Sequence, residues 1–255
     1  MVDVSATGNV GESLFYFENG GSLSASSSDI DVNEGNVFES ISGQLDIDFD
    51  TVGINSNIGN AVLGSGDHTF NSVTVSGNSE NGISSEGTKT YEDVSVSLNW
   101  LDGINGNGDQ VFLNVDVFEN GEDGINGDGE KDYTNVNIEN NFAVGLKGSG
   151  NQVFNTVLVS GNIYDGIEGF GTKDYIDVDV LNNGSDGING NGDQTFTNVN
   201  VSDNAGDGIN SSGVMDFVNV TIENNGGDGI ENSGSVSMSS VNILNNGGRG
   251  LKDFT

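Results

Sequence analysis

Every twenty-first residue from Asn36 to Asn246 is an asparagine, and this fixed interval restricts the fold more than any other feature of the sequence. The column contains Asn36, Asn57, Asn78, Asn99, Asn120, Asn141, Asn162, Asn183, Asn204, Asn225 and Asn246. A strict period of this length predicts a solenoid, because a short repeat buries its apolar side only against the repeats before and after it. The 255 residues therefore predict one repeat body of about 11 coils.

The register of the repeat divides the chain into two predicted segments. Residues 36–255 are expected to form the repeat domain. Residues 1–35, which include the apolar run from Leu14 to Phe17, depart from the register and are expected to cap one end. The sequence stops at Thr255, partway through a coil, and an uncovered strand layer is a template for pairing. Two readings stay open: a piece of a longer solenoid, or subunits that stack on themselves end to end.

Apolar columns show that every repeat contributes a strand. Val115 and Val117 stand two apart with a polar residue between them, which is the alternation of a strand with one buried face. Their columns run from Val73 to Val241 and from Val75 to Ile243. An aromatic column lies three residues before the first of these columns. It contains Phe49, Phe70, Tyr91, Phe112, Tyr133, Phe154, Tyr175, Phe196 and Phe217, followed by Met238. The expected fold is all-β, and glycine interrupts every candidate helix.

Glycine columns mark the corners of each coil. One column contains Gly66, Gly87, Gly108, Gly129, Gly150, Gly171, Gly192, Gly213 and Gly234, where positive φ or close backbone approach is expected. A second glycine column, from Gly82 to Gly250, precedes an aliphatic column from Ile83 to Leu251. The coil is therefore expected to turn at defined places.

The asparagine column itself has two physical explanations, and both can hold. An amide side chain donates and accepts, so identical asparagines one layer apart can form an internal hydrogen-bonded ladder. Asparagine also tolerates left-handed backbone at a tight turn. We expect the ladder to be the main reason for the column.

The segments VTIENNGGDGI (residues 220–230) and VNILNNGGRGL (residues 241–251) resemble the PbH1-type repeats of right-handed parallel β-helix proteins of the pectate-lyase-like superfamily. The resemblance spans residues 36–255, and that family commonly stacks asparagines at a turn between two strands. It implies the fold, but little about activity, because the same fold carries lyases, hydrolases, epimerases, phage tailspikes and adhesins.

Two other solenoids match less well. Phe112, Val115, Val117 and Asn120 fit the LxxLxLxxN spacing of leucine-rich repeats, but the apolar residue expected two positions later is Glu122 here. The return segment is also too rich in glycine for a helix. A calcium β-roll would need a period of nine residues, and the chain has none.

The charge balance restricts the partners. The chain carries 39 acidic and 6 basic residues, a formal net charge of −33, so nucleic acid and anionic membranes would be repelled. Cations are the expected small partners. The chain contains no cysteine, and it shows neither a signal peptide nor an apolar run of membrane-spanning length.

Acidic columns suggest where a cation could bind. Asp102, Asp123, Asp165, Asp186, Asp207 and Asp228 form one column, which Val144 interrupts and Arg249 ends. Each aspartate could accept a hydrogen bond from its own turn, or divalent cations could lie between the layers. The best single metal candidate is the glycine-rich corner, where Asn107 and Asp109 of one coil would stand above Asp128 and Glu130 of the next. These oxygen ligands suit Ca²⁺.

Catalytic residues are scarce, and we expect none. The only arginine, Arg249, and the only histidine, His68, are far apart in the sequence. His68 shares a column with Lys89, Lys131 and Lys173 and with intervening glutamines, so it is expected to be a surface variant. Trp100 and Tyr164 could stack on a sugar. The polar strand faces, such as Asn114 beside Val115, would form a flat hydrophilic sheet.

These observations favour a non-enzymatic β-helix outside the cell or on its surface. It would act as a structural spacer, an adhesin segment or a self-assembling fibre subunit, stabilised by Ca²⁺. The alternative is a polysaccharide-acting lyase or hydrolase, or a tailspike-like glycan-binding protein that uses a carboxylate pair on one face.

Overall fold

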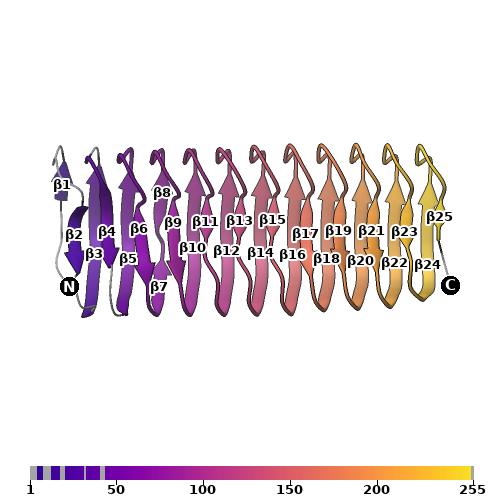
Figure 1. The fold of residues 1–255 in the computed structure, drawn as a ribbon, viewed down its shortest axis with the longest axis horizontal. Helices are drawn as coiled ribbons and strands as arrows, with labels where there is room; N and C mark the ends of the chain where they lie inside the picture. Colours follow the sequence, from indigo (N-terminus) through magenta and orange to yellow (C-terminus); the bar gives the residue numbers. More distant parts are fainter. Residues whose placement is uncertain (1–4, 8–12, 18–20, 32, 41–43, 254–255) are drawn as a thin grey trace. The chain divides into compact units, whose positions relative to one another are not determined.

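Every regular element of this protein is a β-strand in the segments that the structure describes. The computed structural model describes residues 5–7, 13–17, 21–31, 33–40 and 44–253. The chain coils through two parallel sheets, and each coil adds a long strand to one and a short strand to the other (Figure 1). This confirms the all-β parallel solenoid of about 11 coils. None of these segments forms a helix of the length and apolarity that a membrane span requires.

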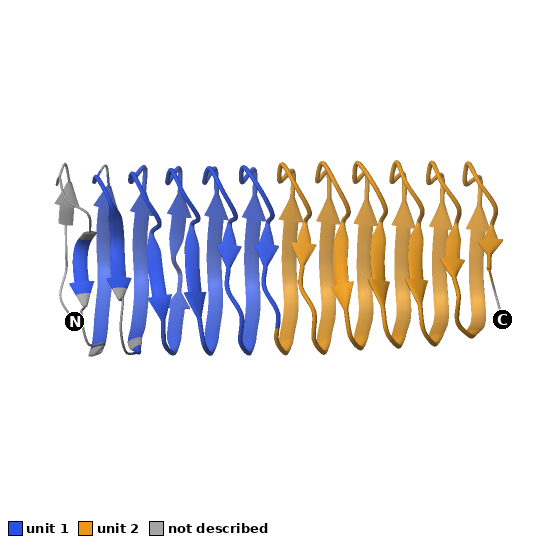
Figure 2. Cartoon of the chain, in the orientation of Figure 1, with its two compact units in different colours: residues 1–128 blue, residues 129–255 orange. Residues whose placement is uncertain are grey.

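Two compact units divide the chain: Met1–Asp128 and Gly129–Thr255 (Figure 2). In unit 1 the long-strand sheet contains β1 (Ser5–Thr7), β3 (Gly21–Asp31), β5 (Leu45–Asn55), β7 (His68–Asn71), β8 (Thr74–Ser76), β10 (Lys89–Ser97) and β12 (Gln110–Phe118). The short-strand sheet contains β2 (Ser13–Phe17), β4 (Asn36–Ser40), β6 (Val62–Ser65), β9 (Ile83–Glu86), β11 (Ile104–Asn105) and β13 (Ile125–Asn126).

Unit 2 repeats the same plan. Its long strands are β14 (Lys131–Glu139), β16 (Gln152–Ser160), β18 (Lys173–Leu181), β20 (Gln194–Ser202), β22 (Met215–Glu223) and β24 (Val236–Leu244). Its short strands are β15 (Leu146–Lys147), β17 (Ile167–Phe170), β19 (Ile188–Asn191), β21 (Ile209–Ser212), β23 (Ile230–Asn232) and β25 (Leu251–Lys252). All pairs within the unit are parallel.

The interval between paired positions of successive coils is 23 or 24 residues near the beginning of unit 1 and 21 residues afterwards. Leu23 pairs with Ile47 and Phe38 with Val62, whereas Tyr91 pairs with Phe112. The longer coil shifts the asparagine register. Asn57 therefore bonds Asn33, with Nδ2 of Asn33 3.0 Å from Oδ1 of Asn57. The prediction that Asn36 begins the ladder was wrong.

The predicted capping segment, residues 1–35, contributes strands where it is described. Ala6 of β1 pairs with Ile30 of β3, and Phe15 of β2 pairs with Phe38 and stacks on its ring at 5.0 Å. Residues 1–4, 8–12, 18–20 and 32 of this segment lie outside the described residues. That residues 1–35 cap one end stays a prediction.

The core of each coil is built from the predicted columns. Tyr91 and Phe112 lie face to face at 4.7 Å, and Tyr175 and Phe196 at 4.8 Å, with every one of these rings buried. The aliphatic columns are buried beside them as far as Val220, Ile222 and Ile230. Because each ring packs on the ring of the next coil, the stack itself supplies the apolar contacts that one coil cannot make alone.

A residue with positive φ bends each long strand between its aromatic and aliphatic positions. Asp177 has φ 55° and Asn198 has φ 57°. Two consecutive exposed residues precede Val178 in β18, so the strand changes direction there. This bend explains the spacing of three between the two columns. The expectation of a flat polar sheet was wrong, because alternation in a flat strand would need a spacing of two.

The glycine corners have the predicted backbone. Gly108 has φ 112°, and a Cβ on it would lie 2.3 Å from the carbonyl oxygen of Gly87 in the preceding coil. Gly171 has φ 110°, and a Cβ on it would clash in the same way with the carbonyl oxygen of Gly150. Both the torsion and the close approach of coils exclude other residues.

The asparagine column forms the predicted internal ladder. Nδ2 of Asn183 donates to Oδ1 of Asn204 at 2.9 Å and to the carbonyl oxygen of Val159 at 3.3 Å. Oδ1 of Asn204 also accepts the backbone N–H of Asn183 at 2.9 Å. Left-handed backbone belongs to the residue before each ladder asparagine, such as Asn182 with φ 57°. The ladder, rather than tolerance of left-handed backbone, therefore explains the column.

Candidate functional site

The column that contains the only histidine lies inside the coils. His68, Lys89, Gln110, Lys131, Gln152, Lys173 and Gln194 are all buried. Nε2 of His68 lies 2.5 Å from Oγ of Ser85. The expectation that His68 is a surface variant was wrong. The sequence contained the necessary signal, because His68 and Phe70 are two residues apart in one strand and so face the same side.

The buried lysines bind backbone carbonyls of the glycine-rich corners. Nζ of Lys89 donates to the carbonyl oxygens of Gly87 at 3.0 Å and Asn107 at 3.2 Å. Nζ of Lys173 donates to the carbonyl oxygen of Phe170 at 3.1 Å. In an intervening coil, Nε2 of Gln110 donates to Gly106 at 2.8 Å. The column thus gives the corner carbonyls a side-chain donor inside the coil, which is a structural role.

His68 is poorly suited to act as a base. Burial, followed by the charge of Lys89, lowers the pKa of His68 to about 4, although Asp46 and Asp67 act in the opposite direction. The ring is therefore neutral near pH 7, and it is closed off from solvent. A substrate in solution would not reach it.

The aspartate column connects successive coils by hydrogen bonds. Oδ1 of Asp186 accepts the backbone N–H of Asp207 at 2.7 Å, and Oδ1 of Asp207 accepts that of Asp228 at 2.6 Å. Earlier in the same column Oδ1 of Asn81 accepts the N–H of Asp102 at 3.0 Å. The expected backbone donor is present, but it belongs to the next coil and not to the same turn.

The second carboxylate oxygen accepts bonds from an asparagine column on the adjoining short strands. Oδ2 of Asp102 accepts from Nδ2 of Asn105 at 2.7 Å and of Asn126 at 3.2 Å. Burial nevertheless raises the pKa of Asp102 to about 6, and the pKa of Asp186 is raised by burial as well. A raised pKa is a property of candidate acid groups.

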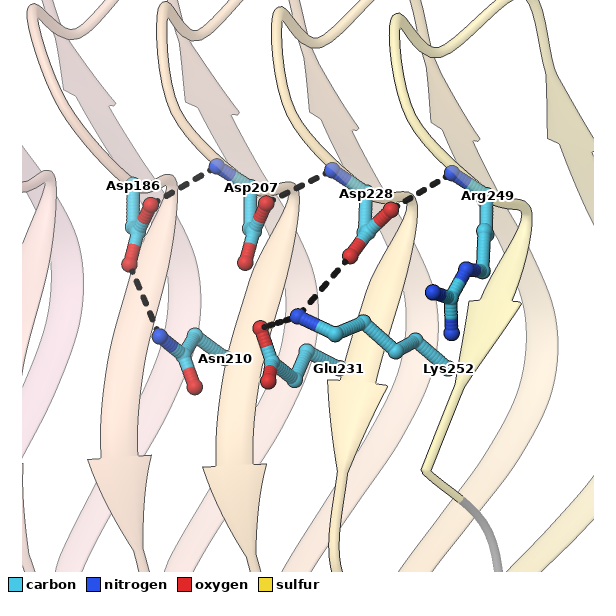
Figure 3. A network of polar contacts seen from close by, with 7 residues as sticks. All are labelled: Asp186, Asp207, Asn210, Asp228, Glu231, Arg249 and Lys252. Carbon is cyan, nitrogen blue, oxygen red and sulfur yellow. Dashed lines mark hydrogen bonds and ion pairs between the residues drawn. The ribbon is translucent and has the colours of Figure 1, made fainter.

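The aspartate column ends in a mixed charge network in unit 2 (Figure 3). Asp207, Asp228 and Glu231 each offer an oxygen within 4.8 Å of the others. Nζ of Lys252 lies 3.3 Å from Oδ2 of Asp228 and 2.8 Å from Oε2 of Glu231. The N–H of Arg249 and the ammonium of Lys252 lower the pKa of Asp228, whereas burial raises that of Asp207. The ammonium of Lys252 therefore supplies the positive charge of this cluster, and a metal ion would have to displace this ammonium.

The predicted calcium site is exposed where its residues are described. Nδ2 of Asn107 donates to Oε1 of Glu86 at 3.1 Å, and its Oδ1 accepts the N–H of Asp128 at 2.7 Å. Asp109 and Asp128 are exposed in unit 1, and Glu130 is exposed in unit 2. Asn107 thus bridges three layers through hydrogen bonds. Calcium binding by these four residues stays a prediction.

Exposed apolar side chains gather at one turn of unit 2. Phe142, Ile163 and Tyr164 are 60%, 49% and 58% exposed. Sequence reasoning named Tyr164, but not Phe142 or Ile163, although both follow a ladder asparagine directly. Trp100, also named, follows the ladder asparagine Asn99 in unit 1 and is 74% exposed.

A shallow pocket lies over the outer side of the long strands of unit 1. Its volume is about 450 Å³, and its lining comprises Ser22, Leu23, Ser24, Asp46, Ile47, Asp48, Asp67 and Thr69. The N–H of Asp67 donates to Oδ1 of Asp46 at 3.2 Å. The lining offers carboxylates and hydroxyls without a basic side chain.

Neither a protein-family profile nor the sequence of a curated protein matches this chain. Among solved structures, the A-module of the mannuronan C-5 epimerase AlgE4 of Azotobacter vinelandii is similar, with a TM-score of 0.52 and 15% sequence identity. The match covers 98% of this chain and 86% of the A-module. At this identity the likeness concerns the fold alone. It confirms the resemblance to parallel β-helix proteins, and it leaves the activity open.

Proposed function

We propose that this protein is a non-catalytic structural β-helix that acts as a spacer or adhesin segment outside the cell or on its surface. One observation carries the proposal: the ionisable side chains that could perform chemistry are bonded into the stack itself. His68 and the lysines Lys89 and Lys173 are buried, and the aspartate column accepts backbone N–H groups of the next coil.

The uniform coils support the same function. Beyond the first coils of unit 1, each strand residue pairs with the residue at the same position of the next repeat, within each unit. An enzyme cleft on this type of scaffold requires loops that project from the coils, because ligands bind in concave sites. Regular stacking of amides and rings instead favours stiffness.

A turnover assay tests this proposal. The protein is incubated at high concentration with mannuronan, polygalacturonate and neutral glucans, and products are followed by proton NMR and by absorbance of unsaturated uronates. We expect no change in either signal. Product formation that follows the protein through purification would refute the structural function.

A second candidate function is polysaccharide modification, and two observations favour it. The fold is similar to that of a mannuronan C-5 epimerase. Asp207, a carboxyl with a raised pKa, lies beside Asp228 and Glu231, which bind the ammonium of Lys252 in the network of Figure 3. If turnover is found, Asp207→Asn should abolish it, whereas the matched control Asp132→Asn, at an exposed position of β14 in unit 2, should not.

Calcium stabilisation and self-association are further parts of the proposal. Calcium at Asn107, Asp109, Asp128 and Glu130 would raise the thermal unfolding midpoint, and chelation would reverse this. Stacking between copies would appear as particles that lengthen with protein concentration in electron micrographs. Monomers that neither calcium nor concentration affects would exclude both.

A further inference from the structure

An exposed apolar patch interrupts the acidic surface of unit 2 at the turn that follows the asparagine ladder. We define the turn patch as Phe142, Ile163 and Tyr164. We propose that the turn patch binds a neutral glycan, with the two aromatic rings stacking on sugar rings. This binding site goes beyond the structural function proposed above.

The fold does not require these side chains, because the repeat supplies its own comparison. In the next three coils of unit 2, the position of Phe142 and Ile163 is occupied by Gly184, Ala205 and Gly226. The position of Tyr164 is occupied by Ser185, Gly206 and Gly227. Those coils form the same strands and the same ladder bonds. Bulk at the turn patch therefore serves something other than folding.

The backbone beneath the patch is fixed. The N–H of Ile163 donates to the carbonyl oxygen of Asn141 at 3.1 Å, and the N–H of Tyr164 donates to that of Ala143 at 3.0 Å. On the other side, the carbonyl oxygen of Tyr164 accepts the N–H of Ser185 at 3.2 Å. The aromatic side chains are thus presented from ordered turns, which reduces the entropy lost on binding.

The acidic column is interrupted at the same place. Val144 replaces the aspartate in the first of the two coils, and Asp165 in the second is buried and accepts the N–H of Asp186 at 2.9 Å. On the adjoining short strands, Lys147 and Glu168 pair at 3.7 Å and offset each other. The turn patch is therefore an apolar surface beside a layer that lacks the aspartate of the column. In a chain with a net charge of −33, this favours a neutral ligand over an anionic one.

The size of the patch excludes a large partner. Three side chains that are about half exposed present on the order of 300 Å² of surface, whereas a stable protein interface needs about 800 Å² from each partner. A sugar ring fits this area. Its C–H face covers an aromatic ring, and its hydroxyl groups can bond the phenol of Tyr164 and the hydroxyl of Ser185.

Affinity gel electrophoresis tests the proposal with four soluble probes: mixed-linkage β-glucan, xyloglucan, galactomannan and dextran. Polygalacturonate serves as the anionic comparison. The test protein is the double variant Phe142→Ala/Tyr164→Ser. Both substitutions introduce residue types that occupy these positions in the following coils. The matched control is Phe170→Ala, since Phe170 is 60% exposed at a different corner of unit 2. Thermal unfolding confirms that each variant is folded, and Tyr164→Ser alone replaces the double variant if that one unfolds.

We expect at least one neutral probe to retard the protein, with the same retardation between about 0.05 and 0.5 M salt, because a neutral ligand is not screened. The double variant should bind about tenfold or more weakly, and Phe170→Ala should bind as the unmodified protein does. Three results would overturn the proposal: no retardation by any neutral probe, equal retardation of the double variant, or retardation by polygalacturonate alone. A smaller particle mass for the double variant in light scattering, without a change in glycan binding, would instead identify a contact between copies and also overturn it.

Discussion

The asparagine ladder and the aspartate column stack side chains at the same coil interval, but with opposite electrostatic consequences. Asn183 and its neighbours both donate and accept, so each amide bonds the next, and the ladder is buried as far as Asn225. Asp186 and its neighbours only accept, so they depend on backbone N–H groups, on asparagines such as Asn210 and finally on Lys252. A neutral stack can repeat without limit, whereas a charged stack needs a donor or cation at every layer.

The largest expected difference between the two columns appears when one side chain of each is removed. Asn183→Ala leaves both the Nδ2 group and the backbone N–H of Asn162 without their buried acceptor, and it should lower the free energy of unfolding by roughly 3–5 kcal/mol. Asp186→Ala removes an acceptor at a partly exposed corner, where water can replace it, and also removes repulsion. Its effect should stay within about 1 kcal/mol.

Urea unfolding followed by circular dichroism measures both variants. Similar losses for Asn183→Ala and Asp186→Ala would show that burial of the ladder adds nothing to its stability. In that case the contrast between neutral and charged stacks would not hold.

The buried column of alternating lysine and glutamine contains both charged and neutral side chains. Adding one charge to it should have an effect of similar size. Gln152 lies between Lys131 and Lys173 in successive coils of unit 2. Gln152→Lys would place three ammonium groups one coil apart, and at about 4.8 Å and an effective dielectric of about 20 each new pair repels by roughly 3 kcal/mol. Because two new pairs form, we expect a loss of roughly 4–7 kcal/mol in unfolding free energy.

Lys173→Gln is the matched control for that variant. It introduces at position 173 the glutamine that the neighbouring coils already have at this position. The free energy of unfolding should change by no more than about 1 kcal/mol. If Gln152→Lys proves as stable as the unmodified protein, the alternation of lysine and glutamine has no electrostatic basis.

The sequence alone was sufficient for most of the fold, because a period is visible without knowing any contact. It placed Asn57 to Asn246 in one ladder and the rings from Phe49 to Phe217 in one stack, and both are confirmed. It placed Asn36 in the wrong column, because one longer coil cannot be recognised from the period of the others. It also placed His68 on the surface, because polar side chains favour the surface, although strand alternation puts His68 on the same side as Phe70.

The candidate sites were less predictable for a different reason. A column shows which residues share a layer position, but not which donors surround them. Lys252, which offsets Asp228 and Glu231, and the turn patch at Phe142 both depend on departures from the repeat. Such departures carry no periodic signal. Comparison between coils, position by position, is the way to find them.

A smaller effect is expected from the pH dependence of the charged stack. Because burial raises the pKa of Asp102 to about 6, above the ordinary value of 3.8, the folded protein binds this proton more tightly than the unfolded chain does. The contribution of Asp102 to stability is therefore greatest below about pH 4 and is lost as the pH rises through about 6. Asp102→Asn, which continues the amides of Asn60 and Asn81, should remove this dependence.

The measurement is the difference in unfolding free energy between Asp102→Asn and the unmodified protein, taken at several pH values. This difference should shift in favour of the variant by roughly 1–3 kcal/mol between pH 4 and 7. His68 contributes in the opposite direction, since its lowered pKa removes stability as the pH falls from about 6.5 to 4, but it is common to both proteins and cancels. A difference that does not change with pH would mean that Asp102 is not desolvated.

The smallest effect is expected at the open end of the aspartate column. Lys252→Ala removes the ammonium that lies 3.3 Å from Asp228 and 2.8 Å from Glu231, at a site that is partly exposed to solvent and screened by salt. Unfolding should hardly change, but the pKa of Asp228 should rise part of the way towards its ordinary value, since the N–H and the charge of Arg249 would still hold it down. Carbon-detected NMR titration of the carboxyl measures this directly, with Lys147→Ala as the control for losing one exposed lysine. An unchanged pKa of Asp228 would show that the backbone N–H alone sets the charge of the last layer, and the aspartate column would then resemble the asparagine ladder more closely than its chemistry suggests.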